Sequence, residues 1–192
     1  MKRLFLIAGL LAAFMLLVVA VGAQKANFAG TWSLDKAASQ GLSPRIQGAD
    51  KVTLTVTQDD KTISLDQKVE GGQPPAGGGG GGAGGGGGMG GGRGAGGGAA
   101  GPQSYNLDGK EATSDVTFGQ NTGKLTTKAT MSAGGLELMR KTSFTGQDGS
   151  ERVNTTTQKL SLSGDGKKLT VVTHREGGQQ AAPDTTMVYN KQ

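Results

Sequence analysis

The 192-residue chain contains no cysteine. This absence excludes disulfide bonds, thiol nucleophiles, thiolate zinc sites and iron–sulfur clusters. The folded part of the chain must therefore be stabilised by side-chain packing and by backbone hydrogen bonds.

Histidine is almost absent, because His174 is the single imidazole. A Ser–His–Asp triad needs a serine presented on a sharp turn, and the sequence contains no G-x-S-x-G motif of that kind. No cluster of residues has the spacing of a zinc site. We therefore expect no enzymatic activity, no metal and no cofactor, and we interpret His174 as an ordinary strand residue.

A strong charge of one sign is also missing. The formal net charge is +5, and removal of Lys2 and Arg3 with a leader would leave +3. Basic and acidic residues alternate, and no basic run is interleaved with aromatic residues. A weak field of this kind does not favour nucleic acid as a partner.

The first residues are typical of a secretory signal peptide. Lys2 and Arg3 precede an uncharged apolar run over residues 4–21, and small residues at 21–23 form a cleavage site of the A-x-A type. We expect residues 1–23 to be removed and the protein to be periplasmic or secreted. The alternative is a retained N-terminal anchor, since about 18 apolar residues approach the length that spans a bilayer.

Glycine dominates one internal segment. Of the 31 residues from Gly71 to Gly101, 21 are glycine, which gives a segment with almost no side chains to bury and a high conformational entropy. We predict a disordered linker or insertion over residues 71–102. Its G-x-G-x-x-G matches carry no weight, because a nucleotide-binding turn must lie between a strand and a helix.

Period-two alternation marks the sequence on both sides of this segment. Residues 51–57 alternate apolar residues with threonine, and residues 61–69 repeat the pattern after a short polar turn. Asp108-Gly109 and three later Gly-containing turns separate further runs of the same kind. The pattern predicts eight to ten antiparallel strands.

These strands predict an all-β fold, an up-and-down barrel or a strongly rolled sheet, since closure removes exposed strand edges. Residues 24–70 would supply the first strands and residues 103–192 the remaining strands of the same domain. We predict no helix in it.

The opening strand carries a resemblance to known proteins. Residues 28–35, F-A-G-T-W-S-L-D, are similar to the first strand of lipocalin and fatty-acid-binding barrels, where a Gly-x-Trp lies at the closed end. Four segments in order also resemble a group of uncharacterised secreted bacterial lipocalin-like domains. They are residues 28–39, 105–111 (Y-x-L-D-G-K-E), 162–171 (L-S-x-D-G-K-x-L-T-V) and 188–191 (V-Y-x-K).

The resemblance implies a barrel plug built from Gly30 and Trp32. In lipocalins a basic residue of a late strand packs over this tryptophan, and Arg140 is the candidate here. Arg140 alternates with Leu136 and Leu138, which would place it on the inner face. A bulge near Met139 would instead turn it toward solvent, and the sequence favours neither arrangement.

Two hypotheses on function follow. In the first, the barrel binds an apolar or amphipathic small molecule. In the second, it is a structural or interaction domain with a filled core that contacts another protein of the cell envelope. Under either hypothesis, we expect contact with a membrane only through the signal segment, if that segment is not cleaved. The first hypothesis predicts a cavity lined by Val52, Leu54, Val56, Ile63, Leu65, Leu125, Met131, Leu138 and Val171.

Overall fold

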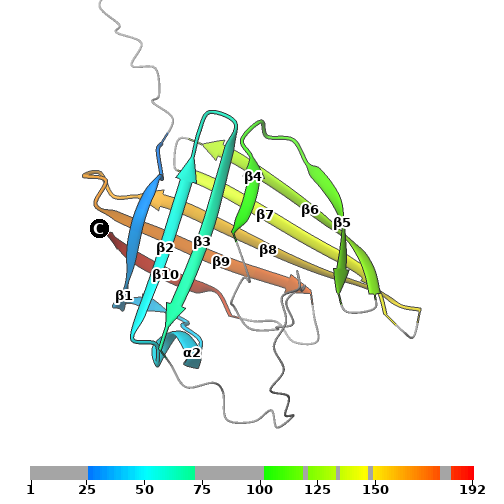
Figure 1. The fold of residues 1–192 in the computed structure, drawn as a ribbon, viewed down its shortest axis with the longest axis horizontal. Coiled ribbons are helices and arrows are strands. Elements are labelled where there is room, and N and C mark those ends of the chain that lie inside the picture. The colour runs from blue at the N-terminus through cyan, green and yellow to red at the C-terminus, as the bar shows by residue number, and fades with distance from the viewer. Residues whose placement is uncertain (1–25, 72–101, 119–120, 133–134, 147–148, 178–182) are drawn as a thin grey trace, which may run out of the picture.

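The computed structural model describes residues 26–71, 102–118, 121–132, 135–146, 149–177 and 183–192. In these residues, ten strands form a single sheet (Figure 1). The strands are β1 (Gly30–Gln40), β2 (Lys51–Gln58), β3 (Thr62–Glu70), β4 (Gln103–Asn106), β5 (Ala112–Phe118), β6 (Asn121–Ser132), β7 (Gly135–Thr145), β8 (Glu151–Leu162), β9 (Lys168–Gly177) and β10 (Thr185–Lys191).

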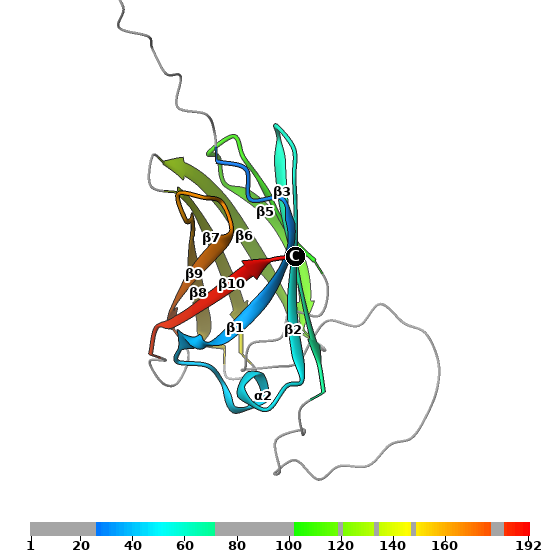
Figure 2. The same ribbon diagram turned by 90° about the vertical axis from the view of Figure 1, so that its left-hand side faces the viewer.

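The strand order is β4-β3-β2-β1-β10-β9-β8-β7-β6-β5, and every neighbouring pair is antiparallel. Strands adjacent in sequence are adjacent in space, except that β1 pairs with β10 and that β4 and β5 end the sheet. Because these two ends follow each other in the chain, the sheet rolls into a nearly closed barrel (Figure 2). The predicted all-β, up-and-down architecture is confirmed.

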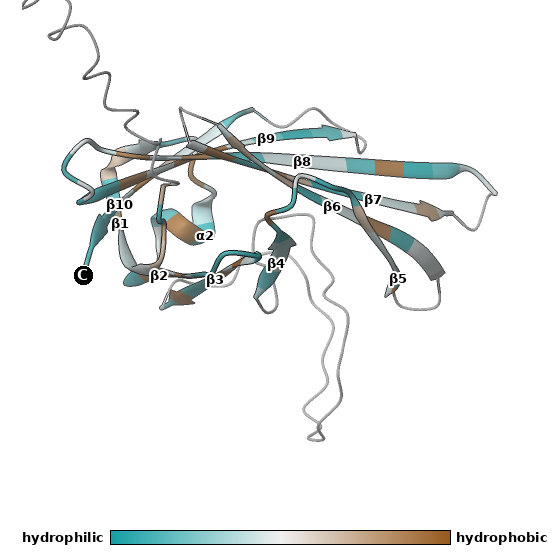
Figure 3. Ribbon diagram, turned by 90° about the horizontal axis from the view of Figure 1, so that it is seen from above, coloured by the Kyte–Doolittle hydropathy of each residue, from teal (hydrophilic) through white to brown (hydrophobic). Residues whose placement is uncertain are grey.

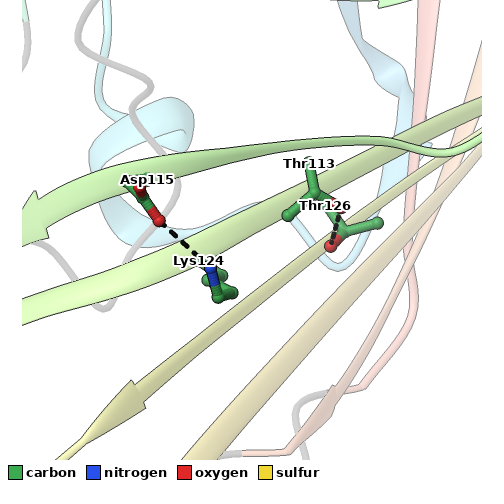
Figure 4. Close-up of polar contacts among 4 residues, drawn as sticks. All are labelled: Thr113, Asp115, Lys124 and Thr126. Atoms are coloured by element: carbon green, nitrogen blue, oxygen red, sulfur yellow. Dashed lines mark hydrogen bonds and ion pairs between the residues drawn. The ribbon is translucent and has the colours of Figure 1, made fainter.

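Alternation along each strand determines which side chains enter the barrel. In the β2–β3 hairpin, Val56 pairs with Leu65 and both are buried, while the pairs on either side, Thr55–Asp66 and Thr57–Ser64, are more exposed. The outer face is polar: across β5 and β6, Lys124 Nζ lies 3.2 Å from Asp115 Oδ1 (Figure 4). The period of two in the sequence is therefore the inside–outside alternation of the sheet.

Most buried apolar side chains belong to one core inside the barrel. Its largest fully buried members are Trp32, Tyr189 and Phe28, surrounded by leucines of β7, β8 and β9. Burial of one such leucine stabilises the fold by roughly 1.5–3 kcal/mol.

A short helix, which the sequence pattern did not predict, covers one end of the barrel between β1 and β2 (Figure 2). This helix, α2 (Pro44–Gln47), is only four residues long and therefore too short for a helical period to be visible. Ile46 is 2% exposed and packs with Leu42, Ala49 and Val52 in a second apolar cluster. The expectation of no helix was wrong at this point.

Two of the sequence predictions fall outside the described residues. The signal peptide over residues 1–23 lies there entirely, and so does nearly all of the glycine-rich segment 71–102, which connects β3 to β4. Among the residues that are described, no helix has the length and apolar character needed to cross a membrane.

Two glycines with positive φ provide a test of the close packing between hairpins. Gly135 (φ +140°) would place a Cβ 2.1 Å from the carbonyl oxygen of Leu160, whereas Gly109 (φ +74°) has no atom within 4 Å of such a Cβ. We expect Gly109→Ala to lower the free energy of unfolding by about 1–2 kcal/mol through backbone strain alone. Gly135→Ala should lower it by clearly more, because the backbone of β8 must also move.

Urea denaturation of both variants measures this difference. Equal losses of stability in the two variants would show that the close approach of Gly135 to the Leu160 carbonyl does not add to the cost of the Gly135→Ala substitution.

Candidate functional site

The sequence-predicted cavity residues all lie on the inner face of the barrel. Seven are buried, namely Val52, Leu54, Val56, Ile63, Leu65, Leu138 and Val171. Val52 packs in the cluster around α2, and the other six belong to the main core. Met131 is partly buried against that core, while Leu125 is half-buried farther along β6. Contact of these residues with a ligand stays a prediction.

Trp32 lies near the start of β1, in the main core of the barrel. Its side chain is fully buried, and its Nε1 donates a hydrogen bond to the carbonyl oxygen of Phe28 at 3.1 Å. Gln58 holds the preceding segment, since its Oε1 accepts from the Phe28 N–H at 2.9 Å and its Nε2 donates to the Ala26 carbonyl at 3.1 Å.

The cation over this tryptophan is Lys191, a residue that the sequence analysis missed. Its Nζ lies 5.3 Å from the centroid of the Trp32 ring, a distance typical of a cation–π contact. A Cβ on Gly30 would lie 3.3 Å from Lys191 Cε, so glycine leaves room for the lysine stem. The alternation of Lys191 with the buried Tyr189 on β10 could have indicated that Lys191 faces inward, but not that it lies over Trp32.

Arg140 faces the interior at a different place. β7 pairs with β8 residue for residue from Leu136 to Thr145 without a bulge. Arg140 therefore shares a face with the fully buried Leu138, and its side chain is half-buried. Of the two arrangements that the sequence left open for Arg140, the inner face and solvent, the structure shows the inner face.

Tyr105 of β4 lies within electrostatic reach of Arg140. The tyrosine is 3% exposed, and its hydroxyl donates a hydrogen bond to Gln103 Oε1 at 3.1 Å. Burial raises the pKa of Tyr105, and the positive charge of Arg140 opposes this shift. The positive charge of Arg140 on β7 thus acts on the buried hydroxyl group of Tyr105 on β4.

Beyond Leu138 the inner face becomes polar. β6 to β9 run well past the shorter strands β2 to β4, as Figure 3 shows from above. Thr127, Arg140, Thr156 and Arg175 stand in register across these four strands. One step farther come Leu125, Thr142 and Asn154, which are half-buried. We call these seven residues the arginine face.

The single histidine lies on the outer face of β9. His174 Nδ1 is 2.5 Å from Asp184 Oδ1, and its Nε2 is 3.4 Å from Glu176 Oε1. The hydrogen bond to Asp184 is the main cause that raises the pKa of His174 above 6.5, and Glu176 adds to the effect. Both ring nitrogens are thus directed at carboxylates, an arrangement typical of an ion cluster on a sheet surface.

No group of three or more described histidine, aspartate or glutamate residues is arranged to hold a metal ion. No protein-family model matches the chain, and no curated protein matches it significantly. The sequence resemblance and the architecture of the barrel are therefore the basis for an assignment of function.

The raised pKa of His174 makes stability depend on pH. Since the folded-state pKa exceeds the unfolded value of 6.5, the contribution of the protonated ring is fully present below that value and is lost as pH rises through the folded-state pKa. We expect the midpoint of thermal unfolding of the wild type to exceed that of His174→Gln most at about pH 5.5, where both carboxylates are ionised.

The difference should shrink steadily as the pH is raised through the folded-state pKa. The titration of the imidazole, followed by NMR, gives the pKa independently. A difference in unfolding midpoint that is constant with pH would contradict the assignment of the ion cluster.

Proposed function

We propose that the protein is an exported, non-catalytic β-barrel that binds an amphipathic small molecule on its inner face. One observation carries the proposal: along the long strands the inner face changes from the buried leucines of β7 to β9 to the half-buried or exposed and mostly polar residues of the arginine face. A ligand with an apolar part and a polar head is complementary to such a surface, because each part would meet side chains of its own kind.

The position of Leu125 supports an amphipathic ligand. This side chain lies on the inner face beyond Arg140, is half-buried, and is not part of the main core. An apolar side chain left partly exposed among threonines gains free energy when a ligand removes it from water. The predicted secretory leader and the resemblance to secreted lipocalin-like domains point to the same class of protein.

The alternative function, a structural or interaction domain of the envelope, also has an observation in its favour. Trp32, Tyr189 and Phe28 fill the barrel beside the leucines of the core. Small barrels packed in this way need no ligand for stability. The alternative predicts that amphiphiles do not bind, which separates the two functions directly.

Titration calorimetry with decanol and decanoate tests the proposal. We expect at least one of the two to bind to the purified protein. Leu125→Asn should weaken that binding about 10-fold, since burial of a leucine side chain is worth roughly 1.5–3 kcal/mol. Thr130→Asn is the matched control, because Thr130 lies exposed on the outer face of the same strand.

An absence of binding by both compounds would support the filled structural domain instead. Native mass spectrometry of the exported protein, followed by extraction of any bound lipid, would then show whether a compound of another class is retained.

A further inference from the structure

The two faces of the sheet differ in their charged residues: in the described strands, the outer face carries both acidic and basic residues, whereas the inner face carries basic residues and no acidic one. Alternation and register place every acidic residue of the described strands on the outer face. These residues are Asp35, Asp66, Glu70, Asp115, Glu137, Glu151 and Glu176. The inner face of β7, β8 and β9 carries Arg140, Arg152 and Arg175. The part of the inner face beyond the core is therefore positive.

Arg140 and Arg175 converge on one place. Both pair with Thr156 of β8, from its two sides, so their Cα atoms are two strand spacings apart, roughly 10 Å. Their side chains leave the same face of a sheet that curves around them. Two guanidinium groups held in this way can share one anionic group between them.

Neither arginine has an anionic partner within the described part of the chain. No hydrogen bond or ion pair there involves the guanidinium of Arg140 or of Arg175, and Arg175 is exposed. Two lysines of the outer face do have anionic partners: Lys124 Nζ lies 3.2 Å from Asp115 Oδ1, and Lys159 Nζ lies 3.7 Å from Glu137 Oε2.

Neutral hydrogen-bonding groups complete the surroundings. Thr127 and Thr156 flank Arg140 in register, and the hydroxyl of Tyr105 lies within its electrostatic reach. The threonine hydroxyl groups and the guanidinium groups together supply donors for the oxygen atoms of a carboxylate or a phosphate. The apolar chain of a ligand would then contact Leu125.

We infer that Arg140 and Arg175 bind the anionic oxygen-bearing head group, carboxylate or phosphate, of an amphiphile. This inference rests on the proposed function, since it names the class of ligand for the same face. Arginine suits the role because its planar group is weakly hydrated and donates in pairs to such oxygens.

Titration calorimetry compares decanol, decanoate and decyl phosphate, which share an apolar chain and differ in the head group. The wild type should bind at least one anion about 10-fold or more tightly than decanol. Arg140→Gln and Arg175→Gln should each remove most of that preference, so that the ratio of the anion affinity to the decanol affinity falls toward one. Lys141→Gln is the matched control, because this substitution removes one positive charge from the outer face, next to Arg140 in the chain.

The outcomes separate this inference from the proposed function. Tighter binding of decanoate or of decyl phosphate supports the inference and identifies the head group. Equal binding of all three compounds overturns the inference and leaves the proposed function intact. The same holds if Lys141→Gln reduces the preference for the anion as much as Arg140→Gln and Arg175→Gln do. Binding of none of them overturns both.

Discussion

The antiparallel pairing of β1 with β10 is the interaction on which the rest of the structure depends. The other strand pairs join neighbours in the chain, whereas this pair joins its two ends, with Leu34 opposite Tyr189 and Trp32 opposite Lys191. It turns two separate antiparallel sheets into one rolled sheet and buries Trp32 and Tyr189 in the same core. Such a contact across the chain carries a large loop-closure entropy, so it must be repaid by burial of these large aromatic side chains.

The unequal lengths of the strands explain why one barrel has two kinds of interior. β6, β7, β8 and β9 have 12, 11, 12 and 10 residues, whereas β2, β3 and β4 have 8, 9 and 4. Where short and long strands face each other, side chains from both close over the core. Where the long strands run on, threonine, asparagine and arginine occupy most of the inward positions, and the apolar Leu125 and Phe144 are only half-buried there. The arginine face follows from this geometry.

Much of the fold could be predicted from the sequence, because alternation is strong where one face is buried. Val56, Leu65 and Leu138 were assigned inward and are buried. The arginine face could not be recognised in the same way, since both faces of β8 are polar from Asn154 to Gln158 and period-two alternation needs a contrast. The register of β8 with β7 and β9 shows that Thr156 faces inward, and no local sequence pattern contains this register. Lys191 over Trp32 was missed for the same reason, because that contact joins the two ends of the chain.

The positive charge of the inner face bears on whether the barrel binds a ligand or is only a structural domain. The Cα atoms of Arg140 and Arg175 are roughly 10 Å apart, and two like charges at such a separation in water repel each other by about 0.4 kcal/mol. A threonine at either position would remove this cost and would suit the strand equally well. On the outer face, Lys124 and Lys159 each lie close to a carboxylate of a neighbouring strand. Arg140 and Arg175 have no such partner among the described residues, and an anion bound between them would turn the repulsion into attraction. This repulsion between two arginines without an anionic partner is thus the physical reason to regard the arginine face as a candidate binding surface.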